Sequence, residues 1–271
     1  MELRYDQSDV QASKRLAGRR GLFARANVAG ISMKFGATVL FLLLQWVNVP
    51  LPNTPRTADG KPDLTAPVPR TSDGKPDLSG LWRNPDGKYL ANIAADGIVV
   101  PFQPGAEALY KERQENFSKD RPSGRCLPHG IPDAMLVPAT PFKLVQTPAV
   151  TLILYENQGR FRQVFTDGRD FPKQMDPTWL GYSVGKWDGD TFVADTRGLN
   201  DQTYLDDGGH PHSDAYHAVE RFHRRDFGHM DMELTIDDPK AYQRPWKVTF
   251  HFELFLDNEI MESVCENELD W

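Results

Sequence analysis

Strict alternation of apolar and polar residues near the C-terminal end constrains the fold of this chain more than any other feature. Residues 230–237 and 248–254 carry an apolar side chain at every second position. Because successive side chains of a β-strand point to opposite faces, this period of two predicts strands with one buried face. The apolar positions are Met230, Met232, Leu234, Ile236, Val248, Phe250, Phe252 and Leu254.

Similar segments, joined by short turns, fill the rest of the C-terminal half. Asp-Gly at 167–168 and at 188–189 separates apolar segments, which is a strong hairpin signal. Before them, residues 104–116 predict one short helix, because Pro104 suits the first helical position and good helix formers follow. We therefore expect a mainly β fold, an antiparallel β-barrel or sandwich with one short helix. The remaining expected strands are 150–156, 160–166, 182–187, 191–196, 216–225 and 259–266.

Residues 1–49 have the composition of an export signal. Basic residues precede an apolar stretch that is densest at 35–49. The Arg-Arg pair at 19–20 resembles a twin-arginine signal, whereas a start at Met33 gives an ordinary secretory signal. The alternative is an uncleaved inner-membrane anchor formed by residues 35–49, although a membrane span needs roughly 20 apolar residues. We expect a periplasmic or secreted protein that meets a membrane only through this segment, and only if it is uncleaved.

A duplication follows at residues 50–76 and continues into the next segment. Residues 55–64 read PRTADGKPDL, and residues 69–78 read PRTSDGKPDL. The segment is rich in proline and poor in apolar residues, so it cannot bury enough surface to offset its chain entropy. We interpret residues 50–76 as a duplicated, extended linker that packs little against the fold, rather than as two binding repeats.

Residues 77–271 have a suitable length for a single β domain. The net charge of −7 argues against nucleic acid as a partner. Two cysteines, Cys126 and Cys265, fit an oxidising compartment. We predict a disulfide between them, with Cα atoms within about 7 Å of each other.

The densest polar cluster, residues 210–221, supplies candidate catalytic residues. His212, His217 and Glu220 are of the side-chain types that act as general acids and bases. Alternation places His217 and Glu220 on opposite faces of one strand, and the histidines lack a standard zinc spacing. We therefore predict no metal site. The alternative to catalysis is a polar loop followed by a structural strand.

Asp195 is a further candidate for acid/base chemistry. A carboxylate that faces inward must be paired, or its pKa must rise, because an unpaired buried charge is costly. The same reasoning applies to Glu220. We predict that His212 or His217 lies within about 6 Å of a carboxylate at the largest pocket. The candidate cationic partners of Glu220 are Arg162, Arg221 and Arg224.

A second block, at residues 165–183, supplies candidate ligand-binding residues. Trp179 and Tyr182 lie near charged residues in the sequence, and aromatic walls with a few charges are typical of small-molecule sites. The alternative is that the aspartates occupy turns and Trp179 belongs to the core. The predicted ligand-binding set is Arg169, Asp176, Trp179, Tyr182 and Arg221. The sequence has no nucleophile elbow, phosphate loop or dinucleotide fingerprint, so we expect no cofactor.

Short motifs resemble two groups of proteins. Gly80-Leu81-Trp82 resembles the Gly-x-Trp of the first strand of lipocalin-like barrels, and Thr166-Asp167 resembles a later Thr-Asp of that family. The domain is also similar to uncharacterised exported bacterial proteins that begin with GKPDLSGxW. The residues that carry this second resemblance are 74–82, 126–128, 176–191 and 264–266. The first resemblance implies a calycin-type barrel, and the second implies export without a known chemistry.

Three functions remain open from the sequence. The leading hypothesis is an exported β-barrel that binds a small apolar or amphipathic molecule, with aromatic and methionine side chains as the lining. The second is an acid/base enzyme that acts on such a ligand in the same pocket. The third is an envelope-associated structural or interaction protein. A pocket with paired histidine and carboxylate groups favours the enzyme, a dry pocket favours the binder, and a filled interior favours the structural role.

Overall fold

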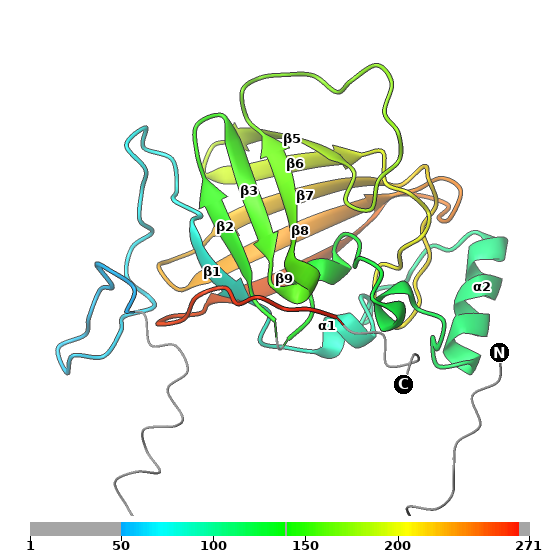
Figure 1. The fold of residues 1–271 in the computed structure, drawn as a ribbon, viewed down its shortest axis with the longest axis horizontal. Coiled ribbons are helices and arrows are strands. Elements are labelled where there is room, and N and C mark those ends of the chain that lie inside the picture. The colour runs from blue at the N-terminus through cyan, green and yellow to red at the C-terminus, as the bar shows by residue number, and fades with distance from the viewer. Residues whose placement is uncertain (1–49, 139, 266–271) are drawn as a thin grey trace, which may run out of the picture. The chain divides into compact units, whose positions relative to one another are not determined.

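The computed structural model describes residues 50–138 and 140–265. Nine strands form a closed barrel in which each strand pairs with its neighbours in sequence and β9 pairs with β1 (Figure 1). The expected mainly β fold is confirmed, and its form is a barrel. The strands are β1 (Gly80–Arg83), β2 (Phe142–Gln146), β3 (Val150–Tyr155), β4 (Arg160–Phe165), β5 (Tyr182–Asp188), β6 (Thr191–Arg197), β7 (His217–Arg224), β8 (His229–Asp237) and β9 (Trp246–Leu254).

Within the described residues, two α-helices and three short 3-10 helices lie outside the barrel wall. The predicted helix is confirmed as α2, which begins at Pro104 and has no buried residue. The other α-helix, α1, is a single turn. Their bounds are α1 (Lys88–Ala91), α2 (Pro104–Glu115), η3 (Pro122–Arg125), η4 (Asp133–Met135) and η5 (Asn157–Gly159).

One neighbouring pair of strands, β4 and β5, is parallel, which corrects the expectation of a purely antiparallel barrel. The strand count explains this pair. In an all-antiparallel meander of nine strands, the first and last strands run in the same direction, yet β1 and β9 pair antiparallel. A single parallel pair reverses the direction of all later strands, so that β9 runs antiparallel to β1 and the barrel can close. The chain forms this pair through residues 166–181, which pass from the end of β4 to the start of β5 (Figure 1).

Two sequence expectations about strands are wrong. Residues 259–265 form no strand, because both edges of β9 are already paired within the barrel, by β8 and β1. Conversely, β2 lies in a stretch rich in proline, residues 122–148, for which the sequence predicted no strand. Its residues pair with β1 on one side and β3 on the other, so tertiary contacts override the local composition.

Alternating residues of the strands fill the barrel interior with large apolar side chains. In β9 every second residue is buried, as the alternation predicts. Aromatic rings contact one another across the interior, with Phe142 and Phe252 packed edge to face at 4.9 Å between ring centroids. The centre of the barrel is therefore occupied by side chains. The fully buried aromatic residues include Trp82, Tyr155, Tyr216, Phe142, Phe192, Phe222, Phe250 and Phe252.

Two boundaries between strands have only two residue pairs each. One is β9–β1, which we call the closed seam, and the other is β4–β5, which we call the open seam. At the closed seam the chain continues from β1 into α1. Tyr89 of α1 is buried and packs edge to face against Phe250 of β9, with 5.1 Å between ring centroids. Its hydroxyl donates to Asp96 at 2.6 Å, so the ring fills the interior while the polar end reaches the surface.

The two copies of the duplicated sequence fold into the same compact loop. In the first copy Thr57 N donates to Lys61 O at 2.9 Å, and Asp63 N donates to Pro55 O at 2.8 Å. The matching bonds of the second copy have the same lengths, 2.9 Å from Thr71 N to Lys75 O and 2.8 Å from Asp77 N to Pro69 O. The glycine of each Asp-Gly pair has a positive φ, +82° at Gly60 and +79° at Gly74, which favours glycine there.

The expectation that residues 50–76 pack little against the domain is wrong for two stretches. Leu64 O and Ala66 O accept bonds of 2.7 and 2.8 Å from the turn between β7 and β8, and Ala66 is buried. In the second copy Arg70 binds both carboxylate oxygens of Asp190 in the β5–β6 turn. The segment thus lies at the end of the barrel opposite α2 (Figure 1).

The predicted export signal or anchor, residues 1–49, lies outside the described residues. Within the described part of the chain, no helix combines the length and the apolar character that a membrane crossing requires.

Candidate functional site

A hollow of about 430 Å³ opens in the barrel wall at the open seam. It exists because β4 and β5 pair only through Val164–Ser183 and Phe165–Val184, which leaves the first residues of β4 without a strand partner on that side. We call it the seam hollow. Its lining combines aromatic side chains with arginines and a few small polar groups. The lining residues are Pro128, Gly159, Arg160, Phe161, Arg162, Gln163, Phe165, Thr178, Trp179, Leu180, Gly181, Tyr182 and Ser183.

Backbone pairing fixes the wall of the seam hollow that faces β4. Thr178 N donates to Gly198 O at 2.9 Å, and Asn200 N donates to Thr178 O at 2.8 Å. These bonds hold the end of the β4–β5 connection, residues 166–181, beside the residues that follow β6. They therefore position Trp179. Gly181 then turns the chain into β5 with a φ of +66°. A Cβ atom there would lie 2.7 Å from the carbonyl oxygen of Arg197, so only glycine fits.

Arg162, one of the residues around the seam hollow, belongs to a buried ion pair. Arg162 points into the barrel from β4, and both of its terminal nitrogens bind Glu220 of β7, Nη1 at 3.2 Å from Oε1. Both side chains are almost fully buried. Beside them Ser183 and Thr196 share a hydrogen bond of 2.9 Å. The seam hollow therefore lies beside a buried cluster of charged and polar side chains.

Several polar atoms around this pair have no hydrogen-bond partner among the described residues. They include Arg162 Nε, Tyr155 Oη and Tyr216 Oη. Burial raises the pKa of Tyr155 to about 12, and burial likewise raises the pKa of Tyr216. Burial opposes the charge of Arg162, but Glu220 and Tyr155 more than offset it, and its pKa lies above the ordinary value. Both tyrosines are therefore neutral and Arg162 is charged at any physiological pH.

The predicted ligand-binding residues are divided between two hollows. Trp179 and Tyr182 line the seam hollow, and Trp179 is half-buried at its wall rather than a core residue. Arg169 and Arg221 instead line a hollow of about 470 Å³ on the outer face of β5, β6 and β7. Asp176 is exposed and lines neither. The two hollows are neighbours, because Arg169 Nη1 lies 3.4 Å from the Tyr182 hydroxyl.

The four predicted catalytic residues do not form one site. His217 Nε2 and Asp195 Oδ1 are 2.8 Å apart on the outer face of the barrel, where Asp195 lines the outer hollow. Glu220 points the opposite way, into the barrel, as the alternation predicts. His212 lies in the preceding loop. His217 and Asp195 thus lie within the predicted 6 Å of each other, beside the outer hollow.

His212 is a buried residue of the loop before β7. Its Nε2 lies 2.6 Å from the hydroxyl of Thr203, and its Nδ1 lies 3.1 Å from the carbonyl of Ser213. Burial lowers the pKa of His212, which favours the neutral ring. Both of its ring nitrogens are thus engaged, and it lines neither of the two hollows described above.

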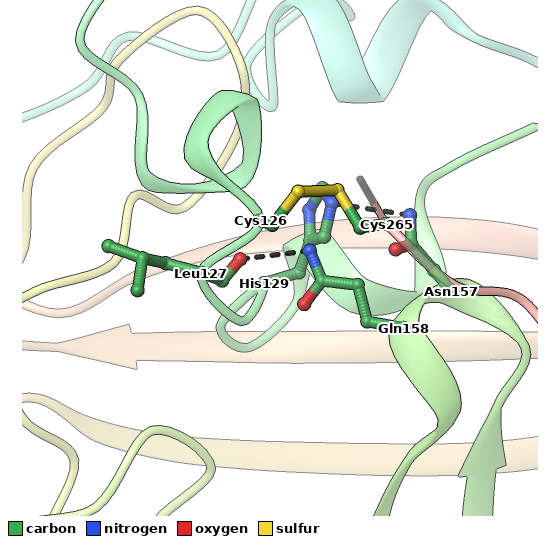
Figure 2. The surroundings of a disulfide bond; sticks show 6 residues. All are labelled: Cys126, Leu127, His129, Asn157, Gln158 and Cys265. Carbon is green, nitrogen blue, oxygen red and sulfur yellow. Dashed lines mark hydrogen bonds between the residues drawn. A yellow bond between two sulfur atoms is a disulfide. The ribbon is translucent and has the colours of Figure 1, made fainter. Parts of the chain in front are cut away.

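The disulfide between Cys126 and Cys265 is confirmed, with 5.5 Å between the Cα atoms. It joins the proline-rich loop to the segment after β9 (Figure 2). Close to it, Gln158 donates to Leu127 O at 3.0 Å and the His129 ring contacts Asn157 (Figure 2). These contacts place Pro128, two residues after Cys126, at the wall of the seam hollow.

Arg162 and Ser183 are the main residues of this site that sequence reasoning did not place in it. Arg162 appears there only as a candidate partner for Glu220. One signal was available: in RFRQVF, alternation from the apolar Val164 puts Arg162 on the inward face. An inward arginine in a strand is unusual enough to mark a site. Nothing local reveals that β4 and β5 fail to pair along their length.

No group of three or more His, Cys, Asp or Glu side chains arranged to hold a metal ion occurs within residues 50–138 and 140–265. No family model, curated protein or solved structure matches this chain. The motif resemblances to lipocalin-like barrels and to exported bacterial proteins therefore stay predictions.

Proposed function

We propose that this protein binds a small apolar or amphipathic molecule in the seam hollow. The observation that carries the proposal is the gap in the barrel wall, where Phe161, Trp179 and Tyr182 line an open hollow. A hollow of about 430 Å³ falls in the range of small-molecule sites, which combine apolar walls with few polar groups.

A ligand would enter the seam hollow through the side of the barrel, whereas many barrels bind their ligands in a cavity at one open end. The duplicated segment lies at one end, the helices lie at the other, and aromatic side chains occupy the centre. A ligand in the seam hollow needs none of that space. The filled centre of the barrel supports the alternative of a structural or interaction protein. The seam hollow supports ligand binding at the side of the barrel.

A binding assay with paired variants tests the proposal. The probe is a dimethylaminonaphthalene dye without a further polar group, whose fluorescence rises in apolar surroundings. We expect the wild-type protein to bind it and Trp179→Ala to weaken binding roughly five- to thirtyfold, since truncating a central aromatic anchor usually costs about 1–2 kcal/mol. Phe171→Ala is the control, because Phe171 packs on Tyr182 outside the hollow. Equal binding by all three proteins would overturn the proposal.

The pair of His217 and Asp195 favours a second candidate function, acid/base catalysis in the outer hollow. Burial works to raise the pKa of Asp195, but His217 and Arg197 outweigh it, so the carboxyl pKa is lowered. An ionised Asp195 would orient the imidazole, and His217 would act as the base. A His217→Ala variant that keeps full turnover of every substrate found for the protein would exclude this role.

Export is part of the proposal. A disulfide is typical of proteins from oxidising compartments, which supports the periplasm or the exterior as the location. Residues 1–49 carry the expected signal, with the inner-membrane anchor as the alternative. Fusing these residues to a reporter and measuring its export would separate the two.

A further inference from the structure

The two copies of the duplicated sequence differ in what they contact. We call residues 55–64 the first loop and residues 69–78 the second loop; their sequences differ at a single position. The second loop is docked on the turn between β5 and β6. Its Arg70 binds Asp190 with 2.7 Å between Nη2 and Oδ2 and 3.1 Å between Nη1 and Oδ1. Two parallel bonds of this kind are the geometry in which arginine recognises a carboxylate most strongly.

A lysine of the second loop adds to this contact. Lys75 Nζ lies 3.4 Å from Gly189 O and 5.8 Å from the centre of the Trp187 ring. An ammonium group near the face of an aromatic ring is attracted by the negative charge of that face. Lys75 is half-buried in this contact, and the neighbouring Pro76 is buried. The second loop therefore recognises a hairpin turn through its acidic residue, a backbone carbonyl and an aromatic ring.

The first loop holds its arginine in the same position. The backbone hydrogen bonds that close the two loops have the same lengths. Arg56 Nη1 donates to Gly60 O at 2.8 Å, and Arg70 Nη1 donates to Gly74 O at 2.8 Å. Each guanidinium is thus fixed against its own loop by one nitrogen. In the second loop the other nitrogen binds Asp190, whereas Arg56 Nη2 has no hydrogen-bond partner among the described residues.

The face of the first loop that matches the docked face of the second loop is open to solvent. Arg56, Lys61 and Pro62 are all exposed. Lys61 lies 2.9 Å from Asp59, in an exposed ion pair that costs little to break. The first loop therefore carries every side chain that the second loop uses for docking, without the hairpin turn that would cover them.

The barrel holds the first loop in place. Leu64 O accepts a bond of 2.7 Å from Gly228 N, and Ala66 O accepts one of 2.8 Å from Phe227 N. These bonds fix the C-terminal end of the first loop on the turn between β7 and β8. A loop that is already ordered loses little conformational entropy when it binds, which favours association.

We propose that the first loop binds an acidic hairpin turn of a partner protein, in the way that the second loop binds the β5–β6 turn. The turn inside this chain reads Trp-Asp-Gly-Asp at residues 187–190, so the partner turn carries an aromatic residue followed by Asp-Gly-Asp. The β5–β6 turn of a second copy of this chain is not free, because its own second loop already binds Asp190. This interaction is independent of ligand binding in the seam hollow.

A cyclic peptide that holds Trp-Asp-Gly-Asp-Thr as a hairpin turn tests the proposal. It is titrated into the isotope-labelled whole chain, and backbone amide shifts are followed by NMR. Millimolar peptide is needed, because a free peptide lacks the high effective concentration that docking within one chain provides. We expect shifts in residues 56–61 and none in residues 70–75, whose turn is already bound. A peptide with Asn in place of the second Asp should bind more weakly.

Two matched variants separate the loop from general charge attraction, since each removes one arginine. Arg56→Ala should weaken peptide binding roughly fivefold, as expected for one well-formed surface ion pair. Arg70→Ala has the same net charge and should keep the shifts in residues 56–61. Neither the fold nor the barrel core depends on Arg56, because its side chain is exposed and bonds only to its own loop among the described residues.

Four results would overturn the proposal. They are no shifts in residues 56–61, equal binding by Arg56→Ala and the wild type, equal binding of the Asp and Asn peptides, and shifts confined to the second loop. A fifth result would name a different partner: if residues 56–61 shift with rising protein concentration in the absence of peptide, the first loop binds a second copy of this chain, and the inferred partner is wrong.

Discussion

The two seams of this barrel have equally few paired residues, but one is filled and the other is open. Each pairs its strands through only two residue pairs. At the closed seam Tyr89 of α1 fills the interior against Phe250. At the open seam the β4–β5 connection and the disulfide loop stand beside β4 and leave a hollow of about 430 Å³ beside a buried ion pair. An aromatic ring fills the gap at the closed seam, whereas the gap at the open seam stays open. The seam hollow is therefore the region to examine for function.

The largest expected effect concerns the disulfide, which lies beside Gly159 and Arg160 at the start of β4. Replacing Cys126 and Cys265 by serine removes a cross-link between residues 139 apart, which the chain-entropy model values at up to about 5 kcal/mol. We expect a large fall in the free energy of unfolding, together with faster hydrogen exchange in β4 than in β9. Urea unfolding and peptide-level exchange measure both quantities. Equal acceleration in the two strands would show that the disulfide does not stabilise β4 more than β9.

The next effect concerns the ion pair beside the open seam. Glu220→Ala leaves Arg162 buried without its counter-ion, and we expect a loss of roughly 3–5 kcal/mol in the free energy of unfolding. The double variant Arg162→Met, Glu220→Leu removes both charges and should recover most of that stability. Chemical denaturation of the three proteins provides the values. A double variant as unstable as the single one would show that the pair itself stabilises the barrel.

A pair of aromatic truncations compares the seams directly. Tyr89 is 2% exposed and Phe161 is 60% exposed. We expect Tyr89→Ala to lower the free energy of unfolding by about 3 kcal/mol, because it leaves a cavity in the core. Phe161→Ala should change it by less than about 0.5 kcal/mol, as surface substitutions do, and should weaken dye binding instead. Similar stability losses in the two variants would remove the distinction between a filled and an open seam.

The smallest effect is the pH dependence of the wall of the open seam. His129, next to Pro128, binds Asp133 with 2.5 Å between Nδ1 and Oδ2. Burial opposes the charged ring, but Asp133 outweighs it with help from Asp207, and the pKa of His129 is raised. A raised folded-state pKa gives stability that is complete below the unfolded value near 6.5. That stability is lost as the pH rises through the folded-state value.

We therefore expect the wild-type protein to lose stability between pH 6 and pH 9 by more than His129→Gln does. Each unit of pKa shift corresponds to about 1.4 kcal/mol, so the difference between the two proteins should be smaller than the effects above. Urea unfolding at several pH values measures it. If the free energy of unfolding depended on pH in the same way in both proteins, the charge of His129 would not contribute to stability.

Much of the fold was predictable because the two faces of a strand appear in the sequence as alternating apolar and polar residues. The alternation in residues 230–237 places Met232 inside and Asp231 outside without any tertiary information. The same rule separates His217 from Glu220. The disulfide was predictable for a different reason, since two cysteines allow only one pairing within the chain. The predicted strand at 259–266 failed because a strand needs a free partner edge, and periodicity does not report whether one exists.

What the tertiary structure alone decided is the set of contacts across the open seam. The sequence determined which side chains face inward, including Arg162, because that depends only on the local period of two. It did not determine that Arg162 meets Glu220, 58 residues away, or that Trp179 stands beside β4. Those contacts follow from closing a barrel of nine strands, which requires a parallel step and a crossover. Closure depends on all the strands together, so no single stretch of sequence contains it.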